Sequence, residues 1–448
     1  VITHRDGHEA MRRAGATEGR DASRLRLPRA LVEEALAVTP KTVTLCGRTP
    51  ERDITLPRGD GGFVMRTGTG AHGFVDPVDR SYRNLQIGDV DAIVAVANQL
   101  DEVGFIAHPF VYGVPELTAD IHSFAAVLQR TDKHAWIQPY GKDNVAYLMR
   151  LAAAAAGGET ALRARPIASC IVCSFTPLEF KVMDVEAIIQ SGRYGLPIHA
   201  CSLPSAGGTA PLTMPGFVLM AATEVIAMVV LAHVLTPGIP VIATPLMFTL
   251  DMRTGRALQS CAESIQAAAA AVQLLGDGFG LVTHTYGMGS DTPDVDVQSA
   301  AERAMLGQAV ALAGADILGG VGQLECATVF SPVQAVLDNE AGAMLRRLRL
   351  SAPVDDESLD WEEISTIRPG GYFIDTPHTF KHCRQQLAPA AFIRDNRDGY
   401  EASGRRTALE QARDLCLDYM RRPAPANLPG EMAQREMAQI VEDADREI

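Results

Sequence analysis

The sequence has no excess of basic residues, because its 40 Lys and Arg stand against 54 Asp and Glu and give a formal net charge of -14. A protein that binds nucleic acid irrespective of base sequence needs clustered Lys and Arg to displace counterions from the phosphates. We therefore expect no nucleic-acid partner. The acidic balance favours solubility and carries little further information about function.

Cysteine is sparse and scattered, with eight residues spread over 448. This differs from the dense framework of a small secreted scaffold, so a reducing, cytoplasmic environment is expected. Cys170 and Cys173 lie three apart on an apolar stretch, and in a strand their side chains would point to opposite faces. They could not share one ion without distortion, so a core role is favoured over a ligand role and no intrinsic metal is expected.

A signal peptide is not evident, because the first residues, VITHRDGHEAMRRAGA, lack an apolar core and are typical of an amphipathic helix. The start at Val1 suggests a numbering that omits part of the native N-terminus. The most apolar stretch, residues 216–235, has the length of a membrane span. Glu224 and His233 interrupt it, and we expect a buried helix and no membrane partner.

Common motifs of covalent catalysis and phosphate binding are missing. No G-x-S-x-G elbow precedes a helix, and no cysteine has a recognisable activating context. The glycine runs at 66–73 and 319–322 lack the lysine of a phosphate loop and the setting of a dinucleotide site. Tight turns are the favoured interpretation of both.

What the chain does have is a regular alternation of short apolar runs with long helical patterns after residue 84. With 47% hydrophobic and 21% charged residues, it can bury a sizeable core. Eight such units favour an α/β fold of the (β/α)₈ TIM-type barrel over an open sheet. The predicted strands are 103–109, 134–140, 166–175, 197–204, 240–246, 281–286, 316–322 and 371–376.

Three regions are predicted along the chain. Residues 1–83 form a small α+β N-terminal extension, and residues 84–420 form the barrel. Residues 421–448 combine a proline-rich connector with a C-terminal helical tail, which could pack against a partner subunit.

The chemistry of such barrels lies at the C-terminal ends of the strands and in the loops that follow. The side chains that this rule selects are His108, Gln138, Tyr140, Ser174, Ser202, Thr244, His284, Tyr286, Gln323 and Glu325.

Several long segments resemble the trimethylamine methyltransferase superfamily, in particular its members without pyrrolysine, such as glycine betaine methyltransferases. The most specific stretch is SDTPDVDVQSAAERAMLGQAVALAGADILGGVGQLECATVFSPVQAVLDNE (290–340). Further matching segments are residues 25–53, 74–106, 203–232 and 240–255, so the resemblance covers nearly the whole chain.

The resemblance implies a barrel with an N-terminal extension and a corrinoid-dependent methyl transfer. Members of the family pass a methyl group from a methylated amine to the Co(I) corrinoid (cobalamin) of a separate carrier protein. The implied partners are a small methylated amine and the corrinoid carrier protein, and a homo-oligomer is expected. The enzyme has to position its substrate and exclude water rather than supply a nucleophile.

Family members that act on trimethylamine carry pyrrolysine inside the barrel, and none is visible here. The corresponding site is expected near residues 285–289. Its absence favours a quaternary amine of the glycine betaine, proline betaine or carnitine type, which leaves as a neutral tertiary amine and needs no general acid.

A quaternary cation is best held by aromatic faces and carboxylates. We expect Glu325, Tyr286 and His284 to be catalytic. The residues expected to bind substrate are Tyr82, Phe110, Tyr140, Arg253, Gln323, Phe330 and His378.

Arg253 or Arg83 could clamp a betaine carboxylate, although an internal ion-pair network is the simpler interpretation of Arg253. Gly319 and Gly320 are assigned to cofactor binding. Many relatives carry a larger side chain such as Tyr or His there, and less bulk would admit a larger substrate or accompany an altered activity.

Two alternatives remain open. The first keeps the methyl-transfer chemistry with a methylated sulfonium or other donor, or with another acceptor. The second is a non-catalytic binder of methylated osmolytes that kept the barrel.

Overall fold

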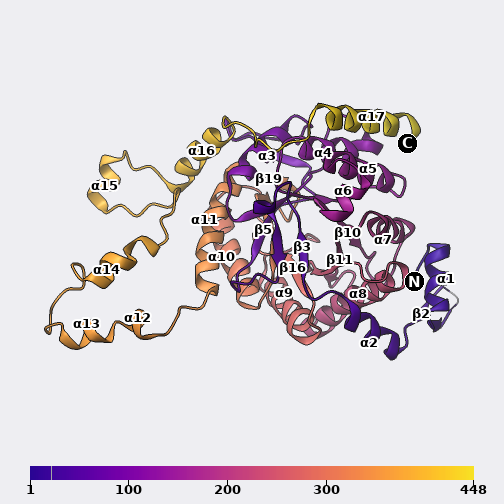
Figure 1. Ribbon diagram of the computed structural model, residues 1–448, viewed down its shortest axis with the longest axis horizontal. Helices are drawn as coiled ribbons and strands as arrows, with labels where there is room; N and C mark the ends of the chain where they lie inside the picture. The colour runs from indigo at the N-terminus through magenta and orange to yellow at the C-terminus, as the bar shows by residue number, and fades with distance from the viewer. Residues whose placement is uncertain (22) are drawn as a thin grey trace.

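The computed structural model describes residues 1–21 and 23–448, and within this part eight parallel strands form a closed barrel (Figure 1). The strands follow one another around the barrel in chain order, and the last pairs with the first. Their bounds are β5 (Val64–Thr67), β8 (Val103–Ala107), β9 (His134–Ile137), β10 (Ala168–Cys173), β11 (Ile198–Ser202), β13 (Val241–Pro245), β16 (Val282–Tyr286) and β17 (Ile317–Val321).

A helix follows each barrel strand and packs on the outside of the barrel, which is the (β/α)₈ arrangement. These helices are α3 (Asp89–Gln99), α4 (Ala119–Leu128), α5 (Asn144–Ala156), α7 (Val182–Tyr194), α8 (Met214–Leu235), α9 (Ala262–Gln273), α10 (Val297–Leu312) and α11 (Pro332–Arg349). The short helix α6 (Glu159–Ala164) and the turns η2 (Glu116–Thr118) and η3 (Leu274–Gly278) lie between them. The predicted barrel class is therefore confirmed.

Seven predicted strands coincide with barrel strands, and the eighth, at 371–376, is wrong. Those residues include no strand, and Tyr372 and Ile374 are exposed outside the barrel. The missing strand is β5, which lies within the segment assigned to the N-terminal extension. The segment around its sequence VMRT was expected to be β structure of that extension, because Arg66 interrupts the apolar run that is typical of a barrel strand.

The apolar stretch at 216–235 is confirmed as a barrel helix. Helix α8 is long and apolar enough to cross a membrane, but it packs against β11, β13, α2 and α9, and over half of its most apolar window is buried. Glu224 in its middle accepts hydrogen bonds from the hydroxyl groups of Ser174 and Ser202 at 2.7 and 2.5 Å. The carboxylate thus links helix α8 to the residues at the ends of two barrel strands by hydrogen bonds.

The N-terminal elements pack on the outside of the barrel and on the end where its strands begin. Helices α1 (Arg5–Arg13) and α2 (Arg29–Val38) contact α8, and the first of these agrees with the predicted amphipathic helix. The hairpin of β3 (Val43–Leu45) and β4 (Ile54–Leu56) covers the N-terminal ends of the strands, where the backbone N–H of Cys46 donates to the carbonyl of Pro166 at 3.2 Å. Strands β1 (Thr17–Glu18) and β2 (Leu25–Arg26) and turn η1 (Pro50–Arg52) complete this region.

Two small sheets surround the opposite end, which is the mouth of the barrel. One joins β6 (Gly73–Val75) and β7 (Tyr82–Asn84) to β18 (Gln323–Leu324) and β19 (Val329–Phe330). The other contains β12 (Ser205–Ala206), β14 (Phe248–Leu250) and β15 (Ala257–Leu258). Loops far apart in the sequence are thereby tied together over the strand ends.

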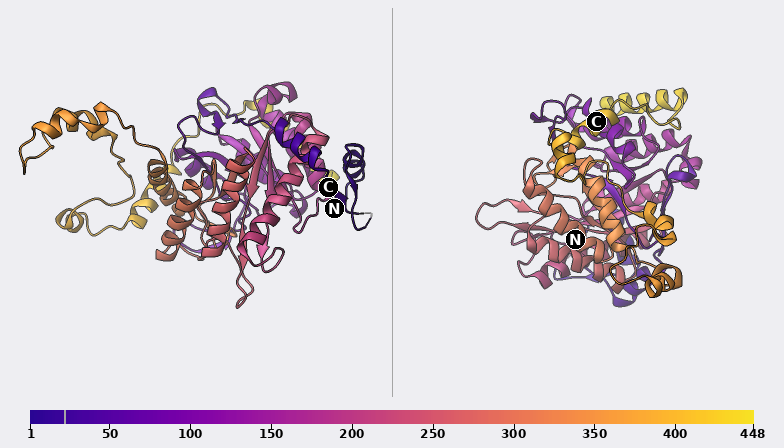
Figure 2. Two further views of the ribbon diagram at one scale, coloured as in Figure 1. Left: turned by 90° about the horizontal axis from the view of Figure 1, so that it is seen from below. Right: turned by 90° about the vertical axis from the view of Figure 1, so that its left-hand side faces the viewer.

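After α11 the chain leaves the barrel as an extended segment and returns to it (Figures 1 and 2). This segment contains α12 (Asp356–Leu359), α13 (Trp361–Thr366), α14 (Pro377–His382), η4 (Cys383–Gln385) and α15 (Arg397–Ala402). Helix α16 (Ala408–Tyr419) then packs on α11 and α3, and α17 (Glu431–Glu447) packs on α5 and α4. The predicted terminal helix therefore packs on its own chain.

Candidate functional site at the mouth of the barrel

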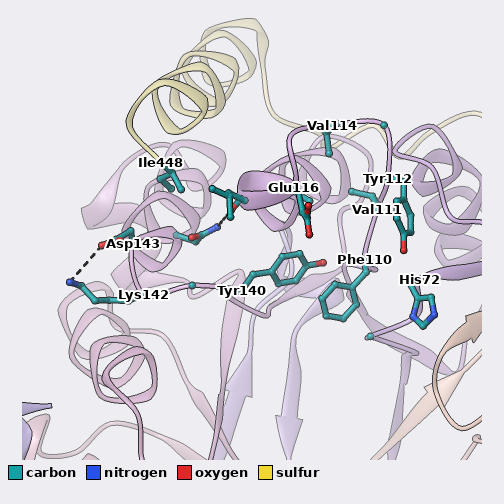
Figure 3. Close-up of a pocket in the computed structure, with 16 residues that line it drawn as sticks. His72, Phe110, Val111, Tyr112, Val114, Glu116, Tyr140, Lys142, Asp143 and Ile448 are labelled. Atoms are coloured by element: carbon teal, nitrogen blue, oxygen red, sulfur yellow. Dashed lines mark hydrogen bonds and ion pairs between the residues drawn. The ribbon is translucent and has the colours of Figure 1, made fainter. Parts of the chain in front are cut away.

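A cleft of about 1140 Å³ opens beside the C-terminal ends of β8 and β9. Its walls come from the loops that follow β5, β8 and β9, and the chain end after α17 closes one side (Figure 3). The side chains that matter for its chemistry are His72, Phe110, Tyr112, Glu116, Tyr140 and Lys142.

Two aromatic rings form the floor of this cleft. Phe110 and Tyr140 stack with their centroids 4.4 Å apart and their planes at 19°. The Tyr140 hydroxyl group is buried and has no hydrogen-bond partner among the described residues, and burial raises its pKa above the ordinary value. Glu116 points toward the Tyr140 ring in Figure 3. The arrangement offers aromatic faces and a carboxylate to a cation.

Asp120, at the start of α4, holds the aromatic floor in place. Its carboxylate accepts hydrogen bonds from the backbone N–H of Tyr140 at 2.8 Å and the side-chain amide of Asn144 at 2.7 Å. Burial raises the pKa of Asp120 to about 6. The loop after β9 is thus anchored to the helix after β8.

His108 also contributes to this anchoring, because its Nε2 accepts a hydrogen bond from the backbone N–H of Gln138 at 3.0 Å. Burial lowers the pKa of His108 to about 4. Its ring is therefore neutral near pH 7 and adds no positive charge beside the cleft.

Below the mouth, the barrel interior contains a buried cation. The Arg66 guanidinium lies 4.0 Å from the centroid of the Trp136 ring and donates from Nε to Nε2 of His284 at 2.8 Å. Its Nη1 donates to the carbonyl of Thr67 at 2.8 Å, whereas Nη2 has no partner among the described residues. Burial lowers the pKa of Arg66 to about 10.

The histidines around Arg66 are neutral. Burial, and then the positive charge of Arg66, lower the pKa values of His284 and His199 well below the ordinary value. Because Nε2 of His284 accepts from Arg66, its proton must sit on Nδ1. His284, expected to be catalytic, therefore lies in a packed layer beneath the cleft as a partner of Arg66.

Tyr286, also expected to be catalytic, ends β16 in the same layer. Its ring centroid lies 5.8 Å from the Arg66 guanidinium carbon and 5.8 Å from the Phe248 ring, and burial raises its pKa. A small part of the side chain, 6%, is exposed. Tyr286 thus lies between the interior layer and the mouth.

Glu325 lies in a different hollow. This second hollow, of about 290 Å³, is lined by Val75, Arg80, Tyr82, Pro293, Asp294 and Glu325. The Glu325 carboxylate lies 3.8 Å from the guanidinium of Arg256, and Tyr82 is 59% exposed. These two predicted site residues lie together, but they do not line the cleft that contains Phe110 and Tyr140.

The backbone at Glu325 is strained. Glu325, Cys326 and Ala327 have φ values of 48°, 55° and 71°, which are left-handed conformations that residues with a side chain rarely adopt. Each such residue costs about 1–3 kcal/mol unless its surroundings hold it. Here the backbone N–H groups of Glu325 and Cys326 donate to the carbonyls of Thr292 and Ser290, which fixes the turn.

Gln323 and Phe330 are buried in the sheet over the mouth. The Gln323 amide donates to the carbonyl of Thr69 and leaves its Oε1 without a partner among the described residues. Phe330 fills the space beside Gly322, where an added Cβ would lie 2.7 Å from the ring. Neither side chain lines the cleft.

Gly319 and Gly320, assigned to cofactor binding, are buried on and beside β17. A Cβ at Gly319 would lie 2.8 Å from Nη2 of Arg66, so the missing side chain leaves the space that the guanidinium fills. Gly320 has a φ of +98° and faces Gln323 and the backbone of Gly289. Neither glycine lines the cleft.

Three other candidates lie away from the cleft. Arg253 is at the tip of the β14–β15 hairpin, with a 93% exposed side chain 3.6 Å from Asp251. His378 lies on α14 in the extended segment, 3.6 Å from Asp360 (Figure 1). Arg83 is held by ion pairs to Asp89 and Asp76 at 2.5 and 3.1 Å.

Sequence reasoning did not select Arg66, Trp136 or Glu116. An arginine between apolar residues just before a glycine-rich turn was the available signal for Arg66. Trp136 was read only as a strand residue. Nothing in the sequence distinguishes Glu116 from other exposed acids before the loop conformation is known.

These features define a (β/α)₈-barrel protein whose candidate site lies at the C-terminal ends of its strands. The family model described as trimethylamine methyltransferase (MTTB) matches residues 2–447, so the chain belongs to this methyltransferase family.

Relatives agree with this assignment. The chain is 29% identical over 424 residues to trimethylamine methyltransferase MttB of Desulfitobacterium hafniense (strain DSM 10664 / DCB-2), covering 94% of this chain and 85% of that protein. It is 27% identical over 388 residues to a glycine betaine methyltransferase of Desulfitobacterium hafniense (strain Y51), covering 85% and 78%.

Among solved structures, the monomethylamine methyltransferase MtmB of Methanosarcina barkeri matches with a TM-score of 0.51 and 12% identity, covering 94% of this chain and 81% of that one. A complex of MtmB with hydroxylamine matches with a TM-score of 0.52 and 13% identity, covering 98% and 85%. At this level of identity the likeness concerns the fold alone.

Proposed function

We propose that this protein transfers a methyl group from a quaternary amine of the glycine betaine, proline betaine or carnitine type to the Co(I) corrinoid of a separate carrier protein. The observation that carries the proposal is the stacked pair Phe110–Tyr140 in an open cleft with Glu116, within a methyltransferase family. One of the relatives is a glycine betaine methyltransferase.

The cleft suits a permanent cation. A quaternary ammonium has no N–H to donate, so it is held by aromatic faces and by opposite charge. Phe110 and Tyr140 supply the faces, and Glu116 supplies a negative charge. His108, which lies next to Tyr140, is neutral near pH 7 and therefore does not repel a bound cation. Because the N-methyl groups carry the positive charge, some of them would contact the rings, which leaves another to face the open side of the cleft.

The cleft also suits a second reactant. Sites for small molecules commonly enclose about 300–1,000 Å³, and a small quaternary amine needs only part of the 1140 Å³ present. The remaining space faces solvent, from which a carrier protein would approach. The corrinoid supplies the nucleophile when its carrier docks.

The residues of this chain need only bind and orient the donor. The leaving group is a neutral tertiary amine, so no proton has to be delivered to it. The Tyr140 hydroxyl, with its raised pKa, stays protonated and cannot act as a base near pH 7. Orientation by Phe110 and Tyr140, and removal of water from the methyl carbon, are the contributions that we assign to this site.

The test follows the absorption of a reduced Co(I) carrier protein mixed with this protein and a panel of betaines and one methylated sulfonium. Consumption of Co(I) with one betaine, only when this protein is present, is the expected result. The Tyr140→Leu variant should raise the Kd of that betaine about 5- to 30-fold, since a desolvated cation–π contact contributes about 1–2 kcal/mol. Tyr82→Leu, in the second hollow, should change it less than about twofold.

Two outcomes would contradict the proposal. Consumption of Co(I) with the sulfonium but with no betaine would assign the other donor class. Binding of a betaine by calorimetry without any consumption of Co(I) would favour the non-catalytic osmolyte binder.

A further inference from the structure

The segment between α11 and α16, residues 351–406, is here called the arm. Figures 1 and 2 show that it extends away from the barrel and carries α12, α13, α14 and α15. All of its residues are described, and among them only Thr376 and Ala391 are buried. The arm therefore has no hydrophobic core of its own.

The arm nevertheless carries many large apolar side chains. Phe380 is 83% exposed and Ile374 is 82% exposed. Val354, Trp361 and Tyr372 are exposed to a similar degree. Single exposed apolar residues are common on soluble proteins, but several large ones on one protruding segment indicate a contact surface.

An apolar groove of about 610 Å³ lies on the body at the base of the arm. It runs between α10 and α11 and reaches the start of α16. Its lining is mainly apolar, and Val297, Met344 and Leu348 are exposed within it. Phe392, where the arm touches the body, already lines one end, so the groove continues directly into the arm.

The arm and the end of the groove also carry charges of opposite sign. The first part of the arm is acidic, because α12 and α13 with their flanking residues carry Asp355, Asp356, Glu357, Asp360, Glu362 and Glu363. Helix α11, which forms one wall of the groove, ends in a basic turn that contains Arg346, Arg347 and Arg349. Arg346 already pairs with Glu102 and Arg349 donates to the carbonyl of Ala315, so Arg347 is the arginine of this turn that is left to meet the acidic arm, and the two surfaces are complementary mainly through their apolar side chains.

We propose that two copies of this chain exchange arms, so that the arm of each copy lies over the groove between α10 and α11 of the other. A second copy is the partner that the surfaces specify, because both complementary parts occur on one chain and a two-fold axis satisfies both contacts at once. A standard interface takes roughly 20–30 residues from each partner. The arm spans residues 351–406 and can supply them.

The test measures the oligomeric state of the full chain by sedimentation velocity across a range of micromolar concentrations. The wild-type protein is expected to sediment as a dimer or as an assembly of dimers. The arm variant Trp361→Ser/Phe380→Ser and the groove variant Leu348→Glu should each raise the dissociation constant at least tenfold. Leu219→Ser on α8, an equally exposed leucine outside both surfaces, should have no effect.

A mixing experiment separates arm exchange from a general loss of solubility. The arm variant keeps an intact groove and the groove variant keeps an intact arm, so their equimolar mixture can restore one of the two contacts. Native mass spectrometry should then detect heterodimers in the mixture at a concentration at which each variant alone is monomeric. A monomeric wild-type protein, or an oligomer that neither variant weakens, would overturn the proposal; circular dichroism verifies that each variant is folded.

Discussion

Asp120 connects the protein interior to the candidate site. It lies at the start of α4, is buried, and accepts the backbone hydrogen bond that fixes Tyr140 in the floor of the cleft. A carboxyl group in this position binds its proton more tightly in the folded than in the unfolded chain, because burial penalises the charged form.

This raised pKa predicts the pH dependence of stability. The favourable contribution of Asp120 is complete well below the ordinary pKa of 3.8 and is lost as the pH rises through the folded-state pKa of about 6. Asp120→Asn, which does not titrate, provides the reference. Between pH 4 and 7, the unfolding free energy of the wild type relative to Asp120→Asn should fall by roughly 2–2.5 kcal/mol, at about 1.4 kcal/mol per pKa unit.

Urea unfolding of both proteins at a series of pH values measures this difference. A difference that stays constant from pH 4 to 7 would show that the buried carboxyl group has an ordinary pKa. A difference that rises with pH would mean that the donors around the carboxylate, which are Asn144 and the backbone N–H groups of Tyr140 and Ile121, outweigh its burial.

Residue types at strand ends predicted part of the candidate site. Phe110 and Tyr140 were both expected to bind substrate, and the structure brings their rings together. Glu325 and Tyr82 also lie together, but in the second hollow. Which hollow a residue lines depends on how loops from opposite ends of the chain pair over the mouth, as β6 does with β19, and no local pattern encodes that pairing.

At the scale of elements, the pattern of apolar runs predicted seven barrel strands. It failed for one buried strand that contains a charge and for one apolar run that is exposed. Strand β5 is buried yet contains Arg66, and Gly319 on the neighbouring strand leaves room for the guanidinium. Residues 371–376 contain a short apolar run like that of a buried strand but have no strand to pair with. A one-dimensional pattern records hydrophobicity, whereas strand formation also requires a partner backbone.

Helix α17 offers a test of how the end of the chain is held. Met437, Ile440 and Ala444 are buried against α4 and α5, and His122 lies 3.0 Å from Asp445. Met437→Ala should destabilise the docked helix by about 2–5 kcal/mol, the usual cost of truncating a buried methionine. Met432→Ala, at an 86% exposed position on the same helix, should cost less than about 0.5 kcal/mol.

Hydrogen exchange of the α17 amides is the direct measurement. Faster exchange confined to this helix in Met437→Ala would show local undocking, and a shift of the whole unfolding transition would show that the helix is coupled to the barrel. Equal protection in the two variants would contradict the packing described.

For the whole molecule, barrel closure depends on the early part of the chain. Removing residues 1–83 deletes β5 and leaves β8 and β17 with one neighbouring strand each, so the barrel stays open and this fragment should lack a cooperative unfolding transition. Removing residues 1–27 deletes α1 but retains all eight barrel strands, so that fragment should unfold cooperatively at a lower denaturant concentration.

Circular dichroism during urea titration distinguishes the two truncations. Cooperative unfolding of the shorter fragment would mean that the barrel closes without β5, contrary to the observed strand pairing. Loss of cooperativity in both fragments would assign to α1 a larger role than its contacts with α8 indicate.

The pairing of β5 with β17 also determines when the barrel can close during synthesis of the chain. Roughly 250 residues separate the two strands, and ribosomes add about 5–20 residues per second, so the edge of β5 waits roughly 12–50 s for its partner. During that interval the strand must be shielded by β8 alone or by a chaperone. The last strand pairing of the barrel to form is therefore the one between β5, which is synthesised first, and β17, which is synthesised last.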